Sequence, residues 1–178
     1  EGPVPAAGPS FTVTQELAGA SIRVRVNYLD QNGVLETVFS APTASVTPLN
    51  DAPVGALVIS DPSPTQGDVL TANVAFIDPD GTAGAVFTFQ WQQQLADGSW
   101  QNIAGATLQQ FIPAAAQLGR AVRAIVSYTD DFGFNETVTS AATEPVGSFL
   151  TGNNNGNNIT GTAFADHIMG LGGADTLN

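Results

Sequence analysis

The last 27 residues of this 178-residue chain divide into three consecutive segments of nine. They read GNNNGNNIT from Gly152, GTAFADHIM from Gly161 and GLGGADTLN from Gly170. Each segment opens with glycine and carries a branched apolar residue at its eighth place, and these residues are Ile159, Ile168 and Leu177. A nine-residue period predicts a coil of turns and short parallel strands. A flexible Gly/Asn linker is the alternative, but a linker has no reason to space apolar residues so evenly.

The composition of each segment suits both a turn and a strand. Glycine tolerates the positive φ angles of tight turns, and the middle side chain of a three-residue strand points inward. We therefore expect Ile159, Ile168 and Leu177 to stack as a narrow core. Backbone carbonyls and carboxylates that converge from such turns provide the oxygen ligands that calcium takes, about six to eight at a time.

The third segment matches the pattern GGxGxDxUx at Gly170, Gly173, Asp175 and Leu177. The second segment keeps the glycine and the aspartate, whereas the first has Asn157 in place of the aspartate. In these features the terminus resembles the calcium-binding parallel β-roll of RTX proteins. The resemblance implies that ions lie between turns two segments apart.

That resemblance implies a set of metal ligands for calcium, the expected cofactor. One complete site would join Asn155 and Asn157 to Asp175, beside Gly170 and Gly173. Asp166 would pair only with a segment beyond residue 178. We therefore expect the terminus to be the opening coil of a longer roll, and to be weakly ordered alone.

A second repeat has a period of 100 residues. Residues 11–46 align with residues 111–146 without a gap, and 14 of the 36 positions are identical. The best-matching parts read IRVRVNYLDQNGVLETVFSA from Ile22 and VRAIVSYTDDFGFNETVTSA from Val122. A period of this length is typical of an immunoglobulin-sized β-sandwich.

Apolar and polar residues alternate within this repeat, which indicates strands. Strands are expected at 22–28, 56–60, 69–76, 86–93, 122–128 and 136–146. Trp91 is expected in the sandwich core, although an aromatic binding platform with Trp100 is the alternative. The fold class is therefore all-β: immunoglobulin-like sandwich modules, then the first turns of a parallel β-roll. The domains are expected at 1–50, the C-terminal half of a module, at 51–147, a complete module, and at 148–178, the start of the roll.

The stretch WQQQLADGSWQNIAGATLQQF from Trp91 and the linker NDAPVG from Asn50 resemble immunoglobulin-like tandem repeats of very large secreted RTX proteins. Some of those proteins are adhesins, and others carry haem peroxidase domains. The resemblance covers residues 11–147. It implies a spacer module, neighbouring modules of the same protein as partners, and type I secretion to the outside or surface of the cell.

Residues 1–50 match only the second half of a module, and by the 100-residue offset of the repeat its first half is expected to begin about fifty residues before residue 1. Half a sandwich leaves apolar faces open. Our hypothesis is that strands from a neighbouring chain complete it, so self-association is an expected partner interaction.

Charge excludes one class of partner. The chain has sixteen acidic residues against four arginines and a net charge of -12, whereas phosphate contacts need clustered basic residues. We expect no nucleic acid partner. No apolar run approaches the roughly 18 residues of a membrane helix, so no membrane insertion is expected, and the first residues do not read as a signal peptide.

Further acids stand in turns outside the nonapeptides. The pairs Asp78 with Asp80 and Asp130 with Asp131 are as dense as calcium loops but lack the EF-hand pattern, and filling turns is the plainer interpretation. Asp51, together with Asp130 or Asp30, is a candidate for calcium bridging between modules. The single histidine, His167, is expected to face solvent without a catalytic role.

No catalytic arrangement is present in the sequence, because cysteine is absent and no nucleophile motif accompanies His167. The expected function is a non-catalytic extracellular spacer or adhesin-type fragment of a large calcium-binding RTX protein. Two alternatives remain: a self-assembling surface-fibre subunit completed by strands of a neighbouring chain, and an adhesive module that binds carbohydrate or protein.

Overall fold

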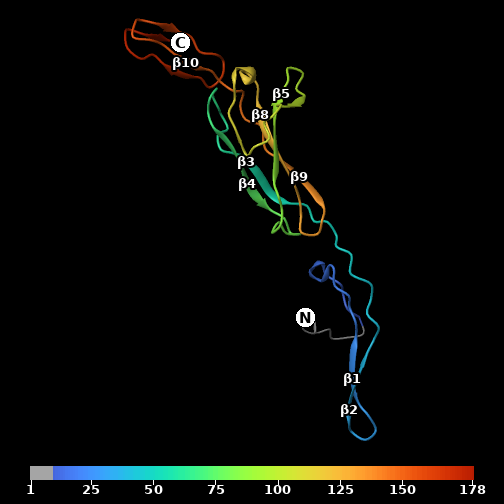
Figure 1. Ribbon diagram of the computed structural model, residues 1–178. Coiled ribbons are helices and arrows are strands. Elements are labelled where there is room, and N and C mark those ends of the chain that lie inside the picture. The colour runs from blue at the N-terminus through green and yellow to red at the C-terminus, as the bar shows by residue number, and fades with distance from the viewer. Residues whose placement is uncertain (1–9) are drawn as a thin grey trace. The chain divides into compact units, whose positions relative to one another are not determined.

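The computed structural model describes residues 10–178, and the chain divides into two units, Glu1–Asn50 and Asp51–Asn178. Strands and two short 3-10 helices, η1 (Gln15–Leu17) and η2 (Ala115–Gln117), make up the regular structure of the described part (Figure 1). The all-β class predicted from the sequence is confirmed. Neither helix within residues 10–178 has the length and apolar character needed to cross a membrane.

The second unit begins with a sandwich of two antiparallel sheets. The first sheet has the order β3 (Val54–Ile59), β4 (Leu70–Ile77), β7 (Gln110–Phe111). The second has the order β6 (Trp100–Asn102), β5 (Thr88–Gln94), β8 (Val122–Thr129), β9 (Asn135–Thr139). Side chains from both sheets share one apolar core.

Trp91 lies at the centre of that core and is fully buried. Its ring stacks on Phe111 from the opposite sheet, with 5.3 Å between ring centroids, and its indole Nε1 donates a hydrogen bond to the Leu108 carbonyl at 3.0 Å. Directly across the sheet Trp91 faces Ala124, and Val122 and Val126 flank that position. Trp91 is therefore a core residue, as the sequence predicts, and no binding platform.

The strand pattern follows the period of two in the sequence. Along β8 every second residue is buried, because alternate side chains of a strand point to opposite faces. The strand expected at 136–146 ends at Thr139. Beyond it, the Ser140 hydroxyl accepts a hydrogen bond from the Ala124 amide of β8, and the Thr143 hydroxyl accepts one from the Val122 amide. Two short strands, β6 and β7, were not anticipated.

The first unit contains the hairpin of β1 (Arg25–Leu29) and β2 (Leu35–Phe39). Its register repeats that of β8 and β9: Val26 faces Val38 as Val126 faces Val138. The flanking backbone bonds repeat as well, since the Ser40 amide donates to the Val24 carbonyl as the Ser140 amide does to Ala124. The 100-residue sequence repeat therefore corresponds to one local structure formed twice.

The environments of the two hairpins differ. Val26 is 53 % exposed and Tyr28 is 48 % exposed, whereas Val126 is 0 % and Tyr128 is 4 % exposed. In the second unit residues 51–111 supply the sheet that covers the hairpin, and within the described part of the first unit nothing equivalent does so. Whether a neighbouring chain completes the first unit stays a prediction.

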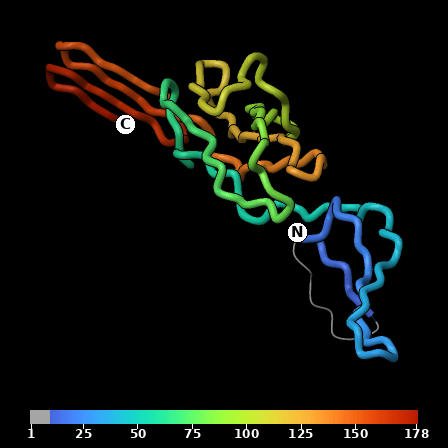
Figure 2. Tube along the Cα trace, turned by 60° about the horizontal axis from the view of Figure 1, so that its bottom comes forward, coloured from blue at the N-terminus to red at the C-terminus, as the bar shows by residue number. Residues whose placement is uncertain are grey.

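After the sandwich, the second unit runs out as an elongated coil at the red end of the tube (Figure 2). Its strands are β10 (Phe149–Thr151), β11 (Asn158–Ile159), β12 (His167–Met169) and β13 (Thr176–Leu177). They pair in parallel, β10 with β12 and β11 with β13. Every partner lies 18 residues away, which is two nonapeptides.

Candidate metal centre

One level of the coil is a full turn of two nonapeptides, because paired strands lie 18 residues apart. Residues at the sixth place of a nonapeptide connect consecutive levels. The amide of Asn157 donates to Asp175 Oδ1 at 2.9 Å, and the amide of Ser148 donates to Asp166 Oδ1 at 2.6 Å. In each pair the two residues are 18 positions apart. The carboxylate of one level is thus held against the backbone of the level two segments before, as the predicted pairing of turns requires.

The same sixth-place side chains also fold back onto the start of their own segment. Asn157 Oδ1 accepts the amide of Asn153 at 2.7 Å, and Asp166 Oδ2 accepts the amide of Thr162. The hydrogen bond from the Ser148 amide, followed by those from Thr162, holds the pKa of Asp166 below its ordinary value, because these bonds stabilise the ionised carboxylate.

The opening glycine of each segment makes room for that carboxyl or amide group. A Cβ at Gly152 would lie 2.5 Å from Asn157 Oδ1, and a Cβ at Gly170 would lie 2.4 Å from Asp175 Oδ2. Gly173 is limited further, because its φ is +107° and a Cβ there would meet Asn155 backbone atoms at 2.5 Å. The glycine period is therefore a packing requirement of this coil.

The expected ligands Asn155, Asn157, Gly173 and Asp175 lie close together on two successive levels, where β11 pairs with β13. The expectation for Asp166 was wrong in one respect. It does not lack a partner within residues 10–178, because β10 precedes the first nonapeptide and places the Ser148 amide against it. Residues 143–151 therefore act as a degenerate nonapeptide with Leu150 at the eighth place.

The eighth-place apolar residues form two rows and not the single stack that the sequence predicts. Ile159 pairs with Leu177, and Ile168 pairs with Leu150, so the two strand pairs form separate two-stranded sheets. Ile159 and Ile168 are half-buried, whereas Leu177 on β13 is 52 % exposed.

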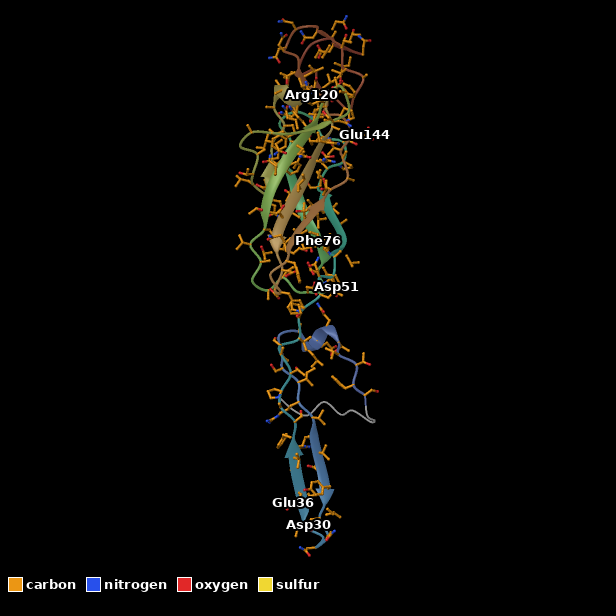
Figure 3. The ribbon with its side chains drawn as sticks, turned by 90° about the vertical axis from the view of Figure 1, so that its right-hand side faces the viewer. Asp30, Glu36, Asp51, Phe76, Arg120 and Glu144 are labelled. Atoms are coloured by element: carbon orange, nitrogen blue, oxygen red, sulfur yellow. The ribbon has the colours of Figure 1, made fainter. Side chains whose placement is uncertain are left out.

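A second candidate centre lies at the other end of the same unit. Asp78 and Asp80 follow β4, and Asp130 follows β8, and one carboxylate oxygen from each lies within 4.8 Å of the others. Among residues 10–178 no other group of three acidic, histidine or cysteine side chains comes together in this way. Figure 3 shows Asp51 at this end of the unit and Arg120 and Glu144 towards the coil.

Hydrogen bonds fix most of the oxygens in this three-aspartate cluster. Asp78 accepts the amide of Asp80 at 2.9 Å and the hydroxyl of Tyr128 at 2.6 Å. Asp130 Oδ1 accepts the amides of Phe132 and Phe134 at 2.8 and 2.9 Å. Burial and the hydrogen bond to Asp78 raise the pKa of Tyr128 far above its ordinary value, so its hydroxyl remains a donor.

The second carboxylate oxygen of Asp130 differs from these in its hydrogen bonding. Asp130 Oδ2 is buried and has no hydrogen-bond partner among residues 10–178, and Asp130 as a whole is only 6 % exposed. Two like charges about 4 Å apart repel by about 1 kcal/mol in water and by about 4 kcal/mol at an effective dielectric of 20. Three carboxylates in a largely buried position are therefore costly without a cation.

The other acids of these loops have clear positions. Asp51, an expected ligand, donates its backbone amide to Asp80 Oδ2 at 2.6 Å while its own side chain is exposed. Asp131 lies outside the cluster and accepts the amides of Ala83 and Gly84. The interpretation of Asp78 and Asp80 as turn fillers therefore missed their meeting with Asp130, which a sequence separation of about 50 residues hides.

His167 lies on β12 and is exposed, with its ring 4.9 Å from that of Phe149. This is the solvent-facing strand position expected from the sequence.

No family model matches the chain, and no curated protein or solved structure matches it significantly.

Proposed function

We propose that this chain is a non-catalytic extracellular spacer segment of a large calcium-binding protein of the RTX type. In this proposal the sandwich units separate other parts of the protein, and the terminal coil is a β-roll that orders when calcium is present. The observation that carries the proposal is the sixth-place hydrogen bond across 18 residues, made by both Asp166 and Asp175.

The side chains and backbone of the coil offer the types of oxygen ligand that a hard cation prefers. Asp175 with Asn155 and Asn157 would hold one ion where β11 pairs with β13, and Asp166 with the backbone around Ser148 would hold another where β10 pairs with β12. Carboxylate, amide and carbonyl oxygens are the ligands that calcium takes. Each of these two sites has one carboxylate, which favours weak binding, in the range of about 0.1 to 1 mM known for extracellular calcium modules.

Binding of this strength would make the folding of the coil depend on whether the protein is inside or outside a cell. A ligand that binds only the folded form stabilises it by RT ln(1 + [L]/Kd), which is small until the ligand exceeds Kd. A coil of this kind would therefore gain structure in millimolar calcium outside a cell. The net charge of -12 adds to the effect, because bound cations relieve the repulsion within an acidic chain.

The test is calcium titration of the full chain by calorimetry, with far-ultraviolet circular dichroism to follow the strand content. The variant Asp166→Asn/Asp175→Asn is expected to lose the part of the β signal that calcium induces in the coil. The control Asp61→Asn/Asp97→Asn removes the same charge from two turn residues, which cap the amides of Ser63 and Ser99, and is expected to respond as the wild type.

Equal calcium-induced changes in β signal for the wild type and Asp166→Asn/Asp175→Asn would contradict the proposal.

A further inference from the structure

The buried oxygen Asp130 Oδ2 needs a partner that the fold itself does not supply. It lies in a cluster of three carboxylates, in which other oxygens accept hydrogen bonds from backbone amides and from the Tyr128 hydroxyl. Buried polar atoms are nearly always satisfied by protein, water or an ion. A positive charge is the partner that also offsets the repulsion between Asp78, Asp80 and Asp130.

The spacing of the cluster suits calcium. Calcium–oxygen distances are about 2.3–2.6 Å, so two oxygens on one calcium ion are at most about 5 Å apart. The three carboxylate oxygens already lie within 4.8 Å of one another. Magnesium holds its ligands at about 2.0–2.1 Å and keeps several waters, whereas Asp80 and Asp130 are 4 % and 6 % exposed and leave little room for water.

We propose that Asp78, Asp80 and Asp130 hold one calcium ion within the sandwich, separately from the coil. The ion would join the segment after β4 to the segment after β8. These two segments already touch through backbone and side-chain bonds, from the Asp131 amide to the Gly81 carbonyl at 3.2 Å and from the Ala83 amide to Asp131 at 3.1 Å. The amide of Asp51 at Asp80 brings the first residue of the unit to the same place.

Ion binding here fastens three points of the chain that are far apart in sequence. Because the unfolded chain does not hold these carboxylates together, the ion binds the folded form and stabilises it. The site thus makes the stability of the sandwich dependent on calcium, independently of whether the coil orders.

The repeat supplies a matched control. Asp30 is the equivalent of Asp130 in the first unit, and its Oδ1 accepts the amides of Asn32 and Val34 as Asp130 Oδ1 accepts those of Phe132 and Phe134. Within residues 10–178, however, Asp30 belongs to no carboxylate cluster. Asp30→Asn therefore makes the same change in the same turn without touching the proposed ion.

The experiment measures thermal unfolding of the full chain in chelator and across a calcium titration, with magnesium as the comparison ion. Unfolding is followed by tryptophan fluorescence, which reports on the sandwich because Trp91 and Trp100 both lie there. For the wild type we expect calcium to raise the melting temperature more than magnesium does. In Asp130→Asn the calcium dependence is expected to weaken by about tenfold or more, because one charged ligand is lost.

The sign of the change in chelator separates an ion site from a purely structural role. Without calcium, Asp130→Asn should melt at or above the wild-type temperature, because the substitution relieves repulsion. A structural role alone would lower the melting temperature equally with and without calcium. Asp80→Asn tests the same ligand set should Asp130→Asn fail to fold, and Asp30→Asn should keep the wild-type calcium response.

The inference does not depend on the proposed function. In Asp166→Asn/Asp175→Asn the calcium response of the sandwich should persist, so loss of the coil signal and loss of the sandwich signal are separate outcomes. The inference is overturned if Asp130→Asn or Asp80→Asn folds and keeps the wild-type calcium response, or if the wild type shows none.

Discussion

Trp91 is the largest fully buried side chain among residues 10–178 and lies in the core of the sandwich. It is fully buried, stacks on Phe111 and has its indole hydrogen satisfied by the Leu108 carbonyl. We expect Trp91→Ala to lower the free energy of unfolding by about 3–5 kcal/mol, because a large cavity replaces the ring. Chemical denaturation followed by circular dichroism measures this directly.

Trp100 is the matched control for that prediction. It is half-buried on β6, and the guanidinium of Arg123 lies 4.1 Å from its ring centre. Such a contact is worth about 0.5–1 kcal/mol at an exposed site, so Trp100→Ala should cost far less than Trp91→Ala. Similar losses for both variants would mean that the core is not centred on Trp91.

Tyr128 connects the core to the three-aspartate cluster. Its ring stacks on Phe76 with 5.6 Å between centroids, and its hydroxyl donates to Asp78 at 2.6 Å. Tyr128→Phe keeps the ring but leaves a carboxylate oxygen without its donor, so we expect a loss of about 1–3 kcal/mol in the free energy of unfolding. Tyr28→Phe is the repeat-equivalent control, at a position that is 48 % exposed, and an equal loss there would contradict the assignment.

At the residue scale, sequence reasoning found the residues that a periodic pattern marks. Trp91 and the sixth-place acids belong to strands or repeats whose spacing is visible along the chain. Asp78 and Asp80 were interpreted as turn residues, because their meeting with Asp130 depends on which strands pair. That information lies in the tertiary structure and not in any local spacing.

At the element scale, the coil depends on glycines that the backbone of a neighbouring level touches. A Cβ at Gly173 would collide with the Asn155 backbone at 2.5 Å, whereas a Cβ at Gly172 would come no closer than 3.1 Å to the side chain of Asn154 and 3.5 Å to its Cα. Gly173→Ala is therefore expected to break the pairing of β11 with β13. The amides of Thr176 and Asn178, which donate to Asn157 and Ile159 at 2.7 and 2.9 Å, should lose protection in NMR hydrogen exchange.

Gly172→Ala is the control, and it should leave those two amides protected. If both variants behave alike, the close approach of the two levels is not what holds the coil together. Leu171, which precedes these glycines, has a φ of 63°, the only positive value at a non-glycine residue within residues 10–178. It stands at the second place of its segment, where the pattern GGxGxDxUx has glycine.

Strands were predictable from sequence where alternation was long, as for β4, β5 and β8. The short strands β6 and β7 were missed because two or three residues are too few to show a period. The roll is expected at 148–178 with its nonapeptides counted from Gly152, and the structure adds one earlier segment, which contains β10. Leu150, nine residues before Ile159, was the remaining signal, since that degenerate segment has neither the opening glycine nor the aspartate.

At the scale of the whole molecule, the exposed hairpin of the first unit predicts self-association. The cross-strand pair Val26 and Val38 is 53 % exposed at both positions, whereas the equivalent Val126 is fully buried. Exposed apolar strands tend to pair with other chains. Light scattering after size exclusion should therefore show oligomers that increase with concentration, and Val26→Lys/Val38→Lys should abolish them.

The opposite face of the same hairpin provides the control. Asn27 and Thr37 are also cross-strand partners, joined by a side-chain hydrogen bond of 2.9 Å, and alternation places them away from the valines. Asn27→Lys/Thr37→Lys should leave association unchanged. A wild-type chain that stays monomeric at every concentration would argue against completion of the first unit by a second copy, and against the fibre-subunit alternative.

The central claim is that calcium orders the terminal coil while the sandwich carries it. Hydrogen–deuterium exchange of the full chain, read by mass spectrometry in chelator and in millimolar calcium, tests this most directly. We predict that calcium slows exchange of peptides within residues 149–178, and also around residues 78–84 and 130–134. Unchanged exchange of the coil peptides in saturating calcium would contradict the claim.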